Sequence, residues 1–165
     1  MHELRPATLR DWADIVVLNN GEVPHVGPLT DEQGDWFLGH AEVTVADTGD
    51  GTIGALLVTM VDGCGYTSPN YRWFTDRYVT FAYVDRIVVH AAHAGHGLGR
   101  RLYDHAVAAS RATGKPVLTA EVNVDPPNER SLDFHRRYGF AEVGQQVDPR
   151  YATTVAMFAL DLRTS

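Results

Sequence analysis

The sequence lacks the features that would place it among secreted, membrane or cysteine-dependent metal proteins. Its 165 residues include a single cysteine, Cys64, which excludes an internal disulfide and a zinc site built from cysteines. No apolar run is long enough to cross a membrane, and residues 1–11 contain no apolar signal core. We therefore expect a cytoplasmic protein that makes no membrane contact.

Basic residues are also scarce, with 14 Lys and Arg against 21 Asp and Glu, which gives a formal net charge of −7. This balance argues against a nucleic-acid-binding protein, which is usually basic, and is compatible with a cationic substrate. The contents of hydrophobic residues (44%) and charged residues (21%) are ordinary for a globular protein. At this length we expect a single domain that spans residues 1–165.

The most informative stretch is a β-branched run followed by a glycine-rich turn and a helix. Residues 87–89 (IVV) predict a buried strand, and residues 93–99 (HAGHGLG) predict the turn. Apolar residues then recur at helical spacing from Leu98 until Gly114 ends the helix. Glycines let backbone N–H groups approach a ligand closely, and a helix start carries partial positive charge. The stretch therefore predicts a phosphate or pyrophosphate site, although such a turn is also a simple connection in many folds.

Two familiar phosphate loops do not fit this turn. A P-loop requires Lys followed by Ser or Thr after its last glycine, but Gly99 is followed by Arg100. A dinucleotide fingerprint requires G-x-G-x-x-G, and its third glycine would fall on Arg100 or Leu102. A metal site at His90, His93 and His96 is not favoured either, because a loop of Ala and Gly gives these side chains no common face.

The turn resembles the coenzyme A loop, motif A, of the GNAT N-acetyltransferase superfamily, whose pattern is roughly V-x-x-x-x-R/Q-G-x-G-x-G/A. Residues 89–99 match it except at Ala94, where that family usually has Arg or Gln. The resemblance implies an acetyl-CoA site in which backbone N–H groups at Val88 or Val89 polarise the thioester carbonyl. The residues of this part of the site would be Ile87, Val88, Val89, Ala94, Gly95, His96, Gly97, Leu98, Gly99 and Arg100.

A second motif lies after a predicted strand at 117–124. Residues 128–140 (NERSLDFHRRYGF) resemble motif B of the same family, N-x-x-A-x-x-F-Y-x-x-x-G-F, which implies cofactor contacts by Asn128, Ser131 and Phe134. His135 stands where many relatives have the Tyr that protonates the leaving thiolate, and Tyr138 is the other candidate acid. The variant PPN-x-x-S-x-x-F-H resembles a subgroup of predicted acetyltransferases.

The other segments predict an α/β fold with a mixed, mostly antiparallel central sheet flanked by helices, as the resemblance implies. Expected strands are 3–6, 43–46, 52–60, 79–89, 117–124, a strand after Gly139, and 152–160. Expected helices start at Thr8 or Asp11 and end near Asn20, run from the cap Thr30 to about His40 with an interruption at Gly34, and cover the segments after Gly97 and Asn128.

Two polar strand residues are candidates for the general base, and the resemblance makes Asp85 the first of them. Asp85 lies in an otherwise apolar strand, where a charge is unusual, and the family often has a carboxylate there. Glu121, which shares a face with Asn123, would act through water. Between residues 62 and 76 lies an aromatic segment, which is either a flap that packs on the sheet or a substrate wall, and residues 148–151 would rim the pocket. The substrate candidates are Tyr71, Trp73, Phe74, Tyr83 and Asn123.

Together these features predict an acetyl-CoA-dependent N-acetyltransferase that acts by direct transfer on a primary amine of a small molecule or peptide. The acceptor stays open among amino acids, polyamines, antibiotics and protein N-termini. A non-catalytic acyl-CoA sensor or binding module is the rival, supported by Ala94 and by the absence of Tyr at position 135; a protein-interaction domain is a weaker third. The family resemblance makes a homodimer reasonable.

Overall fold

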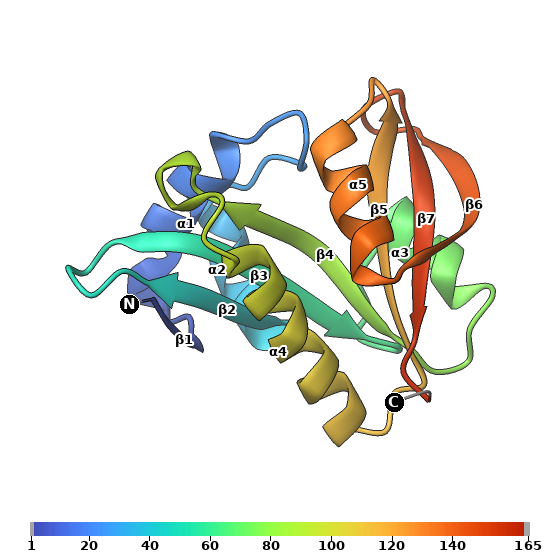
Figure 1. Cartoon of the computed structure of the whole chain (residues 1–165), viewed down its shortest axis with the longest axis horizontal. Coiled ribbons are helices and arrows are strands. Elements are labelled where there is room, and N and C mark those ends of the chain that lie inside the picture. Colours follow the sequence, from blue (N-terminus) through green and yellow to red (C-terminus); the bar gives the residue numbers. More distant parts are fainter. Residues whose placement is uncertain (1, 164–165) are drawn as a thin grey trace. The chain divides into compact units, whose positions relative to one another are not determined.

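The computed structural model describes residues 2–163, which fold into an α/β arrangement (Figure 1). The strands in this part of the chain are β1 (Glu3–Pro6), β2 (Glu42–Asp47), β3 (Ile53–Val61), β4 (Ala82–Val89), β5 (Val117–Asp125), β6 (Ala141–Asp148) and β7 (Thr153–Asp161). The α-helices are α1 (Trp12–Asn20), α2 (Gly34–His40), α3 (Pro69–Thr75), α4 (Leu98–Ala112) and α5 (Glu129–Tyr138). Short 3-10 turns precede α1, α2 and α4 at Leu9–Asp11, Asp31–Gln33 and Ala91–His93.

The strands belong to one mixed sheet with the order β1-β2-β3-β4-β5-β7-β6. The pairs β1–β2, β2–β3, β5–β7 and β6–β7 are antiparallel, whereas β4 and β5 are parallel. The predicted fold class, a mixed and mostly antiparallel sheet with helices, is confirmed. Within residues 2–163, no helix combines the length and the apolar composition that crossing a bilayer requires.

The chain divides into two compact units, which are described separately. Unit 1 comprises residues 2–60 and 86–106, and unit 2 comprises residues 61–85 and 107–163 of the described chain. The boundary falls inside two continuous elements. Residues 82–85 of β4 belong to unit 2 and residues 86–89 to unit 1, while α4 passes from unit 1 into unit 2 after Ala106.

The core of unit 1 forms where α1 and α2 pack through aromatic rings. Trp12 stacks on Phe37 with ring centroids 5.8 Å apart, and its Nε1 donates to the carbonyl oxygen of Thr30 at 3.0 Å. A Cβ at Gly34 would lie only 2.9 Å from the Trp12 ring, so this position needs a residue without a side chain. The predicted interruption at Gly34 is therefore wrong: Gly34 is the first residue of α2, and its lack of a side chain permits the packing.

Arg86, on β4, is a buried charge of unit 1 that is hydrogen-bonded to the end of α1 and to the segment after it. One guanidinium nitrogen donates to the side-chain oxygen of Asn19 and to the carbonyl oxygen of Gly27, both at 3.0 Å. The guanidinium also lies 5.4 Å from the centre of the Phe37 ring. Buried charges persist when they are hydrogen-bonded, so Arg86 ties β4 to the segment after α1.

Unit 2 contains an aromatic core and a helix that packs on two strands. Tyr71, Phe74, Phe81 and Tyr83 are buried with ring centroids 5.4–6.4 Å apart. On the sheet, α5 lies along β5 and β7 (Figure 1). Gly139 ends α5 with a φ of 120°, a left-handed conformation that glycine adopts without the penalty of a Cβ, as its place in the sequence predicts.

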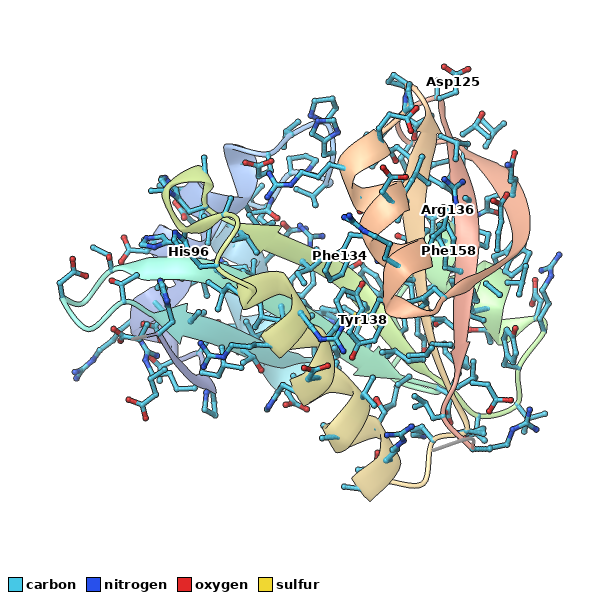
Figure 2. All side chains as sticks on the ribbon, viewed as in Figure 1. His96, Asp125, Phe134, Arg136, Tyr138 and Phe158 are labelled. Carbon is cyan, nitrogen blue, oxygen red and sulfur yellow. The ribbon has the colours of Figure 1, made fainter. Side chains whose placement is uncertain are left out.

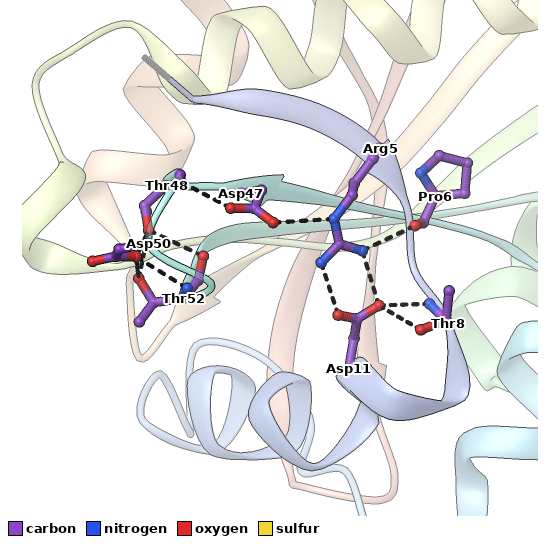
Figure 3. Close-up of polar contacts among 9 residues, drawn as sticks. Arg5, Pro6, Thr8, Asp11, Asp47, Thr48, Asp50 and Thr52 are labelled. Carbon is purple, nitrogen blue, oxygen red and sulfur yellow. Dashed lines mark hydrogen bonds and ion pairs between the residues drawn. The ribbon is translucent and has the colours of Figure 1, made fainter.

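An arginine fork in unit 1 ties the first strand to two other elements (Figure 3). Arg5 donates two parallel hydrogen bonds to Asp11, at 2.8 and 2.9 Å, and a third to Asp47 at 3.2 Å. Asp11 also accepts from the backbone and the hydroxyl of Thr8. The hydrogen bonds from Arg5, followed by those from Thr8, outweigh the effect of burial and hold the pKa of Asp11 well below its usual range.

Arg5→Met should lower the free energy of unfolding by about 1–2 kcal/mol, because both parallel bonds to Asp11 are lost. In the wild type, the depressed pKa of Asp11 means that its stabilising contribution is complete above pH about 4 and is lost as the pH falls further. Urea unfolding at pH 7 and pH 3 measures both effects, and the difference between wild type and Arg5→Met should shrink at pH 3.

Arg163 provides the control for this prediction. It makes an equally forked pair with Asp161, at 3.0 and 2.6 Å, but 74% of its side chain is exposed. Arg163→Met should leave the free energy of unfolding unchanged, because exposed pairs contribute little. An equal loss in the two variants would show that the position of Arg5 between β1, β2 and the first turn has no special role.

Candidate functional site

The glycine turn that precedes α4 has the open geometry of an anion cradle. Gly95 and Gly97 have φ values of +80° and +74°, which other residues rarely adopt, and no described atom lies within 4 Å of a Cβ placed on either. The helix begins at Leu98, as predicted, and the N–H of Arg101 closes its first turn onto the carbonyl oxygen of Gly97. His96 lies in this turn (Figure 2). Backbone N–H groups at such a start are available to a phosphate.

The histidines before the turn have structural roles. The His90 N–H donates to the carbonyl oxygen of Gly54 at 2.9 Å, and the His90 ring caps the 3-10 turn by accepting from Ala92. His93 lies against Gly54, where a Cβ would be 3.0 Å from its ring, and it hydrogen-bonds His2 at 3.0 Å. Within residues 2–163, no three His, Cys, Asp or Glu side chains are grouped to hold a metal ion.

The two arginines at the start of α4 differ in their environments. Arg101 donates to the carbonyl oxygen of His2 at 2.9 Å, so its side chain reaches the beginning of β1. Arg100 is 69% exposed and lies 4.0 Å from Asp104, one turn along the helix. An exposed arginine beside a glycine turn can pair with a phosphate, so the geometry is compatible with the expectation for Arg100.

In unit 2, the two candidate bases follow the last paired positions of two parallel strands. The register of β4 and β5 runs from Ala82 opposite Leu118 to Val84 opposite Ala120. Asp85 and Glu121 are the next residues on the two strands. The sequence predicts the two carboxylates as separate candidate bases, and the register places them at the same level of neighbouring strands.

Glu121 is the most strongly perturbed of these carboxyls. Its Oε1 accepts from the Tyr83 hydroxyl at 2.8 Å and from the side-chain amide of Asn70 at 3.2 Å. Its Oε2 is shielded from solvent and has no hydrogen-bond partner among the described residues. Burial, together with the charge of Asp85, raises the pKa of Glu121 to about 8, although the hydrogen bonds from Tyr83 and Asn70 favour the charged form. A carboxyl with this pKa can exchange a proton near neutral pH.

Asn70 connects Glu121 to a second, paired carboxylate. Its amide nitrogen also donates to Asp148 at 3.2 Å, and its oxygen accepts from Gln146 at 2.7 Å. Arg150 binds both carboxylate oxygens of Asp148, at 3.0 and 2.8 Å. Burial alone would raise the pKa of Asp148, but these bonds and the charge of Arg150 outweigh burial and leave the pKa lowered. We call Asn70, Tyr83, Asp85, Glu121, Asp148 and Arg150 the carboxylate cluster.

His135 is packed inside unit 2, where its ring is stacked on Phe158 at 5.7 Å. Its Nδ1 lies 2.7 Å from the carbonyl oxygen of Ser131, which can only accept, so Nδ1 carries the proton. Burial lowers the pKa of His135 despite that bond. A neutral ring with its proton on Nδ1 has none to give from Nε2, so this geometry disfavours His135 as an acid.

Other motif B residues lie at the start and along one side of α5. Asn128 caps the helix by accepting from the N–H of Ser131 at 3.2 Å, which is a structural role that its motif position did not reveal. Phe134 and Tyr138 lie one helical turn apart on the same side of α5, with ring centroids separated by 6.1 Å (Figure 2). Tyr138 is half-buried and remains the other candidate acid.

The aromatic segment contributes mostly to packing. Ser68 caps α3, and Tyr71 donates its hydroxyl proton to the carbonyl oxygen of Val61 at 2.6 Å. Phe74 is fully buried in the aromatic core. Trp73 lies so close to β6 that a Cβ at Gly144 would be 2.5 Å from its ring. These contacts support the interpretation of a flap that packs on the sheet, while substrate contact by Tyr71, Trp73 and Phe74 stays a prediction.

The sequence does not predict the contacts of Asn70 and Gln146, and it predicts residues 148–151 only as a rim of the pocket. The run Ser68-Pro69-Asn70 predicts a turn that starts a helix, and the structure contains this helix, α3. Nothing in the run indicates that Asn70 bridges Glu121 and Asp148, which lie 51 and 78 positions further along the chain. Asn123, which shares a strand with Glu121, is half-buried, and its carbonyl oxygen accepts from the N–H of Asn128 at 3.0 Å.

The model of the acetyltransferase (GNAT) family matches residues 9–140. The chain therefore belongs to this family, as the two motifs predict. It is similar to the L-amino acid N-acyltransferase MnaT of Escherichia coli strain K12, with 33% identity over 84 residues, which are 47% of this chain and 48% of that protein. It is also similar to the L-methionine sulfoximine/L-methionine sulfone acetyltransferase of Salmonella typhimurium, with 36% identity over 59 residues, 36% of this chain and 33% of that one. The matches thus span half or less of these relatives.

Solved structures share the fold over nearly the whole chain. The Salmonella typhimurium protein yncA, solved with its cofactor acetyl-CoA, has a TM-score of 0.73 and 21% identity, covering 98% of this chain and 94% of that one. The ribosomal-protein-S18-alanine N-acetyltransferase of Escherichia coli has a TM-score of 0.73, 15% identity and the same coverage. At these identities the likeness establishes the fold alone.

Asn70→Ala should lower the free energy of unfolding by about 1–3 kcal/mol, because it removes a donor from two carboxylates and the acceptor of Gln146. Gln146→Ala is the control, since it removes one hydrogen bond and touches neither Glu121 nor Asp148 through that bond. Urea unfolding at pH 7 measures both variants. Equal losses would show that the bridge between the two carboxylates contributes no more than a single amide pair.

Proposed function

We propose that the protein is an acetyl-CoA-dependent N-acetyltransferase that transfers an acetyl group directly to a primary amine of a small molecule or peptide. The observation that carries the proposal is the Glu121 carboxyl, whose raised pKa suits removal of a proton from an ammonium group. Membership of the acetyltransferase family supports the reaction type.

The turn before α4 fits the diphosphate of acetyl-CoA. Gly95 and Gly97 leave open space above the backbone, and the start of α4 supplies N–H donors and partial positive charge. Arg100 is exposed at the same end of the helix. The bound cofactor would supply an acetyl group activated as a thioester. The backbone N–H groups at Val88 or Val89 would polarise its carbonyl oxygen.

Glu121 and Tyr138 carry the proton transfers in this proposal. Glu121 receives the proton of the acceptor amine at Oε2, because Oε1 is already held by Tyr83 and Asn70. Burial and, after it, the charge of Asp85 keep the pKa of Glu121 high enough for this task. Tyr138 holds the proton for the departing sulfur at its hydroxyl, a role that the buried, Nδ1-protonated ring of His135 suits poorly. In the same proposal, Phe134 and Ser131 contact the cofactor.

We also propose that residues 1–165 act as one domain, in the cytoplasm and without nucleic acid. The two units share β4 and α4, so neither contains a complete set of elements, which supports a single domain. The net charge of −7 supports the absence of a nucleic-acid partner. The proposal of a homodimer rests on the resemblance to the family. Light scattering measures the oligomeric state.

Gly95→Ala and Gly97→Ala should each weaken acetyl-CoA binding by about tenfold or more, because each strains a positive φ and fills the open cradle. Isothermal titration calorimetry with acetyl-CoA measures the affinity. Gly49→Ala is a matched control, since Gly49 has a φ of +89° and equally open surroundings in the β2–β3 turn. Equal affinities in all three variants would show that the turn at Gly95 and Gly97 does not bind acetyl-CoA.

The rate constant kcat/KM should rise with pH through an apparent pKa of about 8, because Glu121 must lose its proton before it can act as the base. Asp85→Asn should move this pKa to lower pH, because it removes the charge that disfavours ionisation. Glu121→Gln should slow turnover by about 10²-fold or more and abolish that limb of the profile. Release of free thiol from acetyl-CoA with a panel of amines measures all three.

The binding-only alternative has its own support in Ala94 and in the buried, neutral His135. Binding of acetyl-CoA with no thiol release for any amine would favour that alternative. If the protein turns over amines and Glu121→Gln leaves the pH profile unchanged, the protein is an enzyme but Glu121 is not its general base.

A further inference from the structure

Asn70 reaches two members of the carboxylate cluster with a single amide nitrogen. Its Nδ2 donates to Oε1 of Glu121 and to Oδ2 of Asp148, each at 3.2 Å. An amide nitrogen carries two hydrogens, so one is available to each carboxylate. Asn70 is buried, so its amide has little access to water. This amide supports both carboxylates only while its nitrogen, and not its oxygen, faces them.

The oxygen of the same amide is held by a residue at the edge of the sheet. Gln146 lies on β6, the edge strand, and its Nε2 donates to Oδ1 of Asn70 at 2.7 Å. This bond is shorter than either bond from the Asn70 nitrogen to a carboxylate. Without that donor the buried Oδ1 would be unsatisfied, which favours rotation of the amide towards another partner. A rotated amide would no longer hold Oε1 of Glu121.

We propose that Gln146 is a positioning residue, which acts on the Glu121 carboxyl by holding the nitrogen of the Asn70 amide against it. This inference rests on the proposed function and adds to it a residue that lies outside the carboxylate cluster. Tyr83 and Asn70 occupy Oε1 of Glu121 and leave Oε2 to take the proton of the acceptor. Gln146 thus helps to determine which oxygen of the proposed base reacts.

The other groups around Glu121 fix the direction of the expected effect. The titratable and charged ones are Tyr83 and Asp85 on β4, Asp148 on β6 and Arg150 in the β6–β7 turn. On β7, the uncharged Met157 lies opposite Glu121. Burial has the largest effect and raises the pKa of Glu121, whereas the hydrogen bond from Asn70 lowers it. Loss of the Gln146 donor removes no charge and weakens that bond, so the pKa of Glu121 should rise.

Gln146→Met tests the inference, because methionine keeps the length of the side chain and removes its donor. The apparent pKa of kcat/KM should rise by about 0.5 or more, so kcat/KM at pH 7 should fall about threefold or more and recover at pH about 9.5. Release of free thiol from acetyl-CoA with the amine panel, followed across this pH range, measures the profile. No change, or a loss of equal size at every pH, would overturn the inference.

Gln145 provides the matched control. It is the neighbouring residue on β6, it is exposed, and its Nε2 donates to Oε1 of Glu142 at 2.8 Å. Gln145→Met removes a similar bond from the same strand and should leave the apparent pKa at its wild-type value. An equal rise in both variants would overturn the inference. Gln146→Ala also lacks the donor, so it should repeat the effect and takes the place of Gln146→Met if that variant does not fold.

A double-mutant cycle tests the route through Asn70. Asn70→Ala should itself raise the apparent pKa, because it removes a donor to Oε1 of Glu121. Gln146→Met should then cause no further rise in the Asn70→Ala background, since residues that act through one contact are not additive. A rise of full size in that background would show that Gln146 acts by another route and would overturn the inference.

Failure of the proposed function gives a different result, namely no thiol release with any amine, or release that does not depend on Glu121. The ionisation of Glu121 itself then decides the inference. Carbon NMR of its side-chain carboxyl measures the pKa directly, with Glu121→Gln used to assign the signal. A higher pKa in Gln146→Met but not in Gln145→Met would support the inference, and equal values in both variants and the wild type would overturn it.

Discussion

The burial of the Glu121 carboxyl is the constraint on which the proposed proton transfer depends. Glu121 follows the last residue of β5 that pairs with β4, and Tyr83 and Asn70 bind its Oε1. Through Asn70 the same network reaches Asp148 and Arg150 at the end of β6. One carboxyl group therefore links α3, β4, β5 and the β6–β7 turn, and the positions of its donors determine which oxygen stays available.

This arrangement has a cost for stability. Because the folded state raises the pKa of Glu121 from 4.5 to about 8, it binds that proton more tightly than the unfolded chain does. The contribution of Glu121 to stability is therefore greatest below pH about 4.5 and falls as the pH rises towards 8, the range in which a base must ionise. Asp148 shows the opposite solution, since hydrogen bonds from Arg150 and Asn70 keep its pKa lowered despite its burial. The unfavourable burial therefore falls on Glu121, the group that we propose as the base.

Local signals in the sequence predicted most elements, and long-range contacts account for what they missed. The Thr30–Gln33 capping box, the glycine turn and the glycine that ends α5 act within a few residues, so their patterns can be read directly. Gly34 was misjudged because its neighbour is the Trp12 ring, which lies 22 positions earlier in the chain. Asn70 was missed because its partners lie on β5 and β6. The motif position of His135 predicted an acid, whereas the carbonyl oxygen of Ser131 fixes its proton on Nδ1, and the rings of Phe140 and Phe158 pack against it.

The division of the chain explains why one strand carries both halves of the proposed mechanism. Asp85 is the last residue of unit 2 on β4, and Arg86 is the first residue of unit 1. The strand therefore leads from the carboxylate cluster through Val88 and Val89 to the glycine turn without a break in the chain. Of the proposed site residues, Gly95 and Gly97 belong to unit 1, whereas Glu121 belongs to unit 2. In the proposed mechanism, a change that altered β4 would affect cofactor binding and proton transfer together, because residues of both roles lie on or next to this strand.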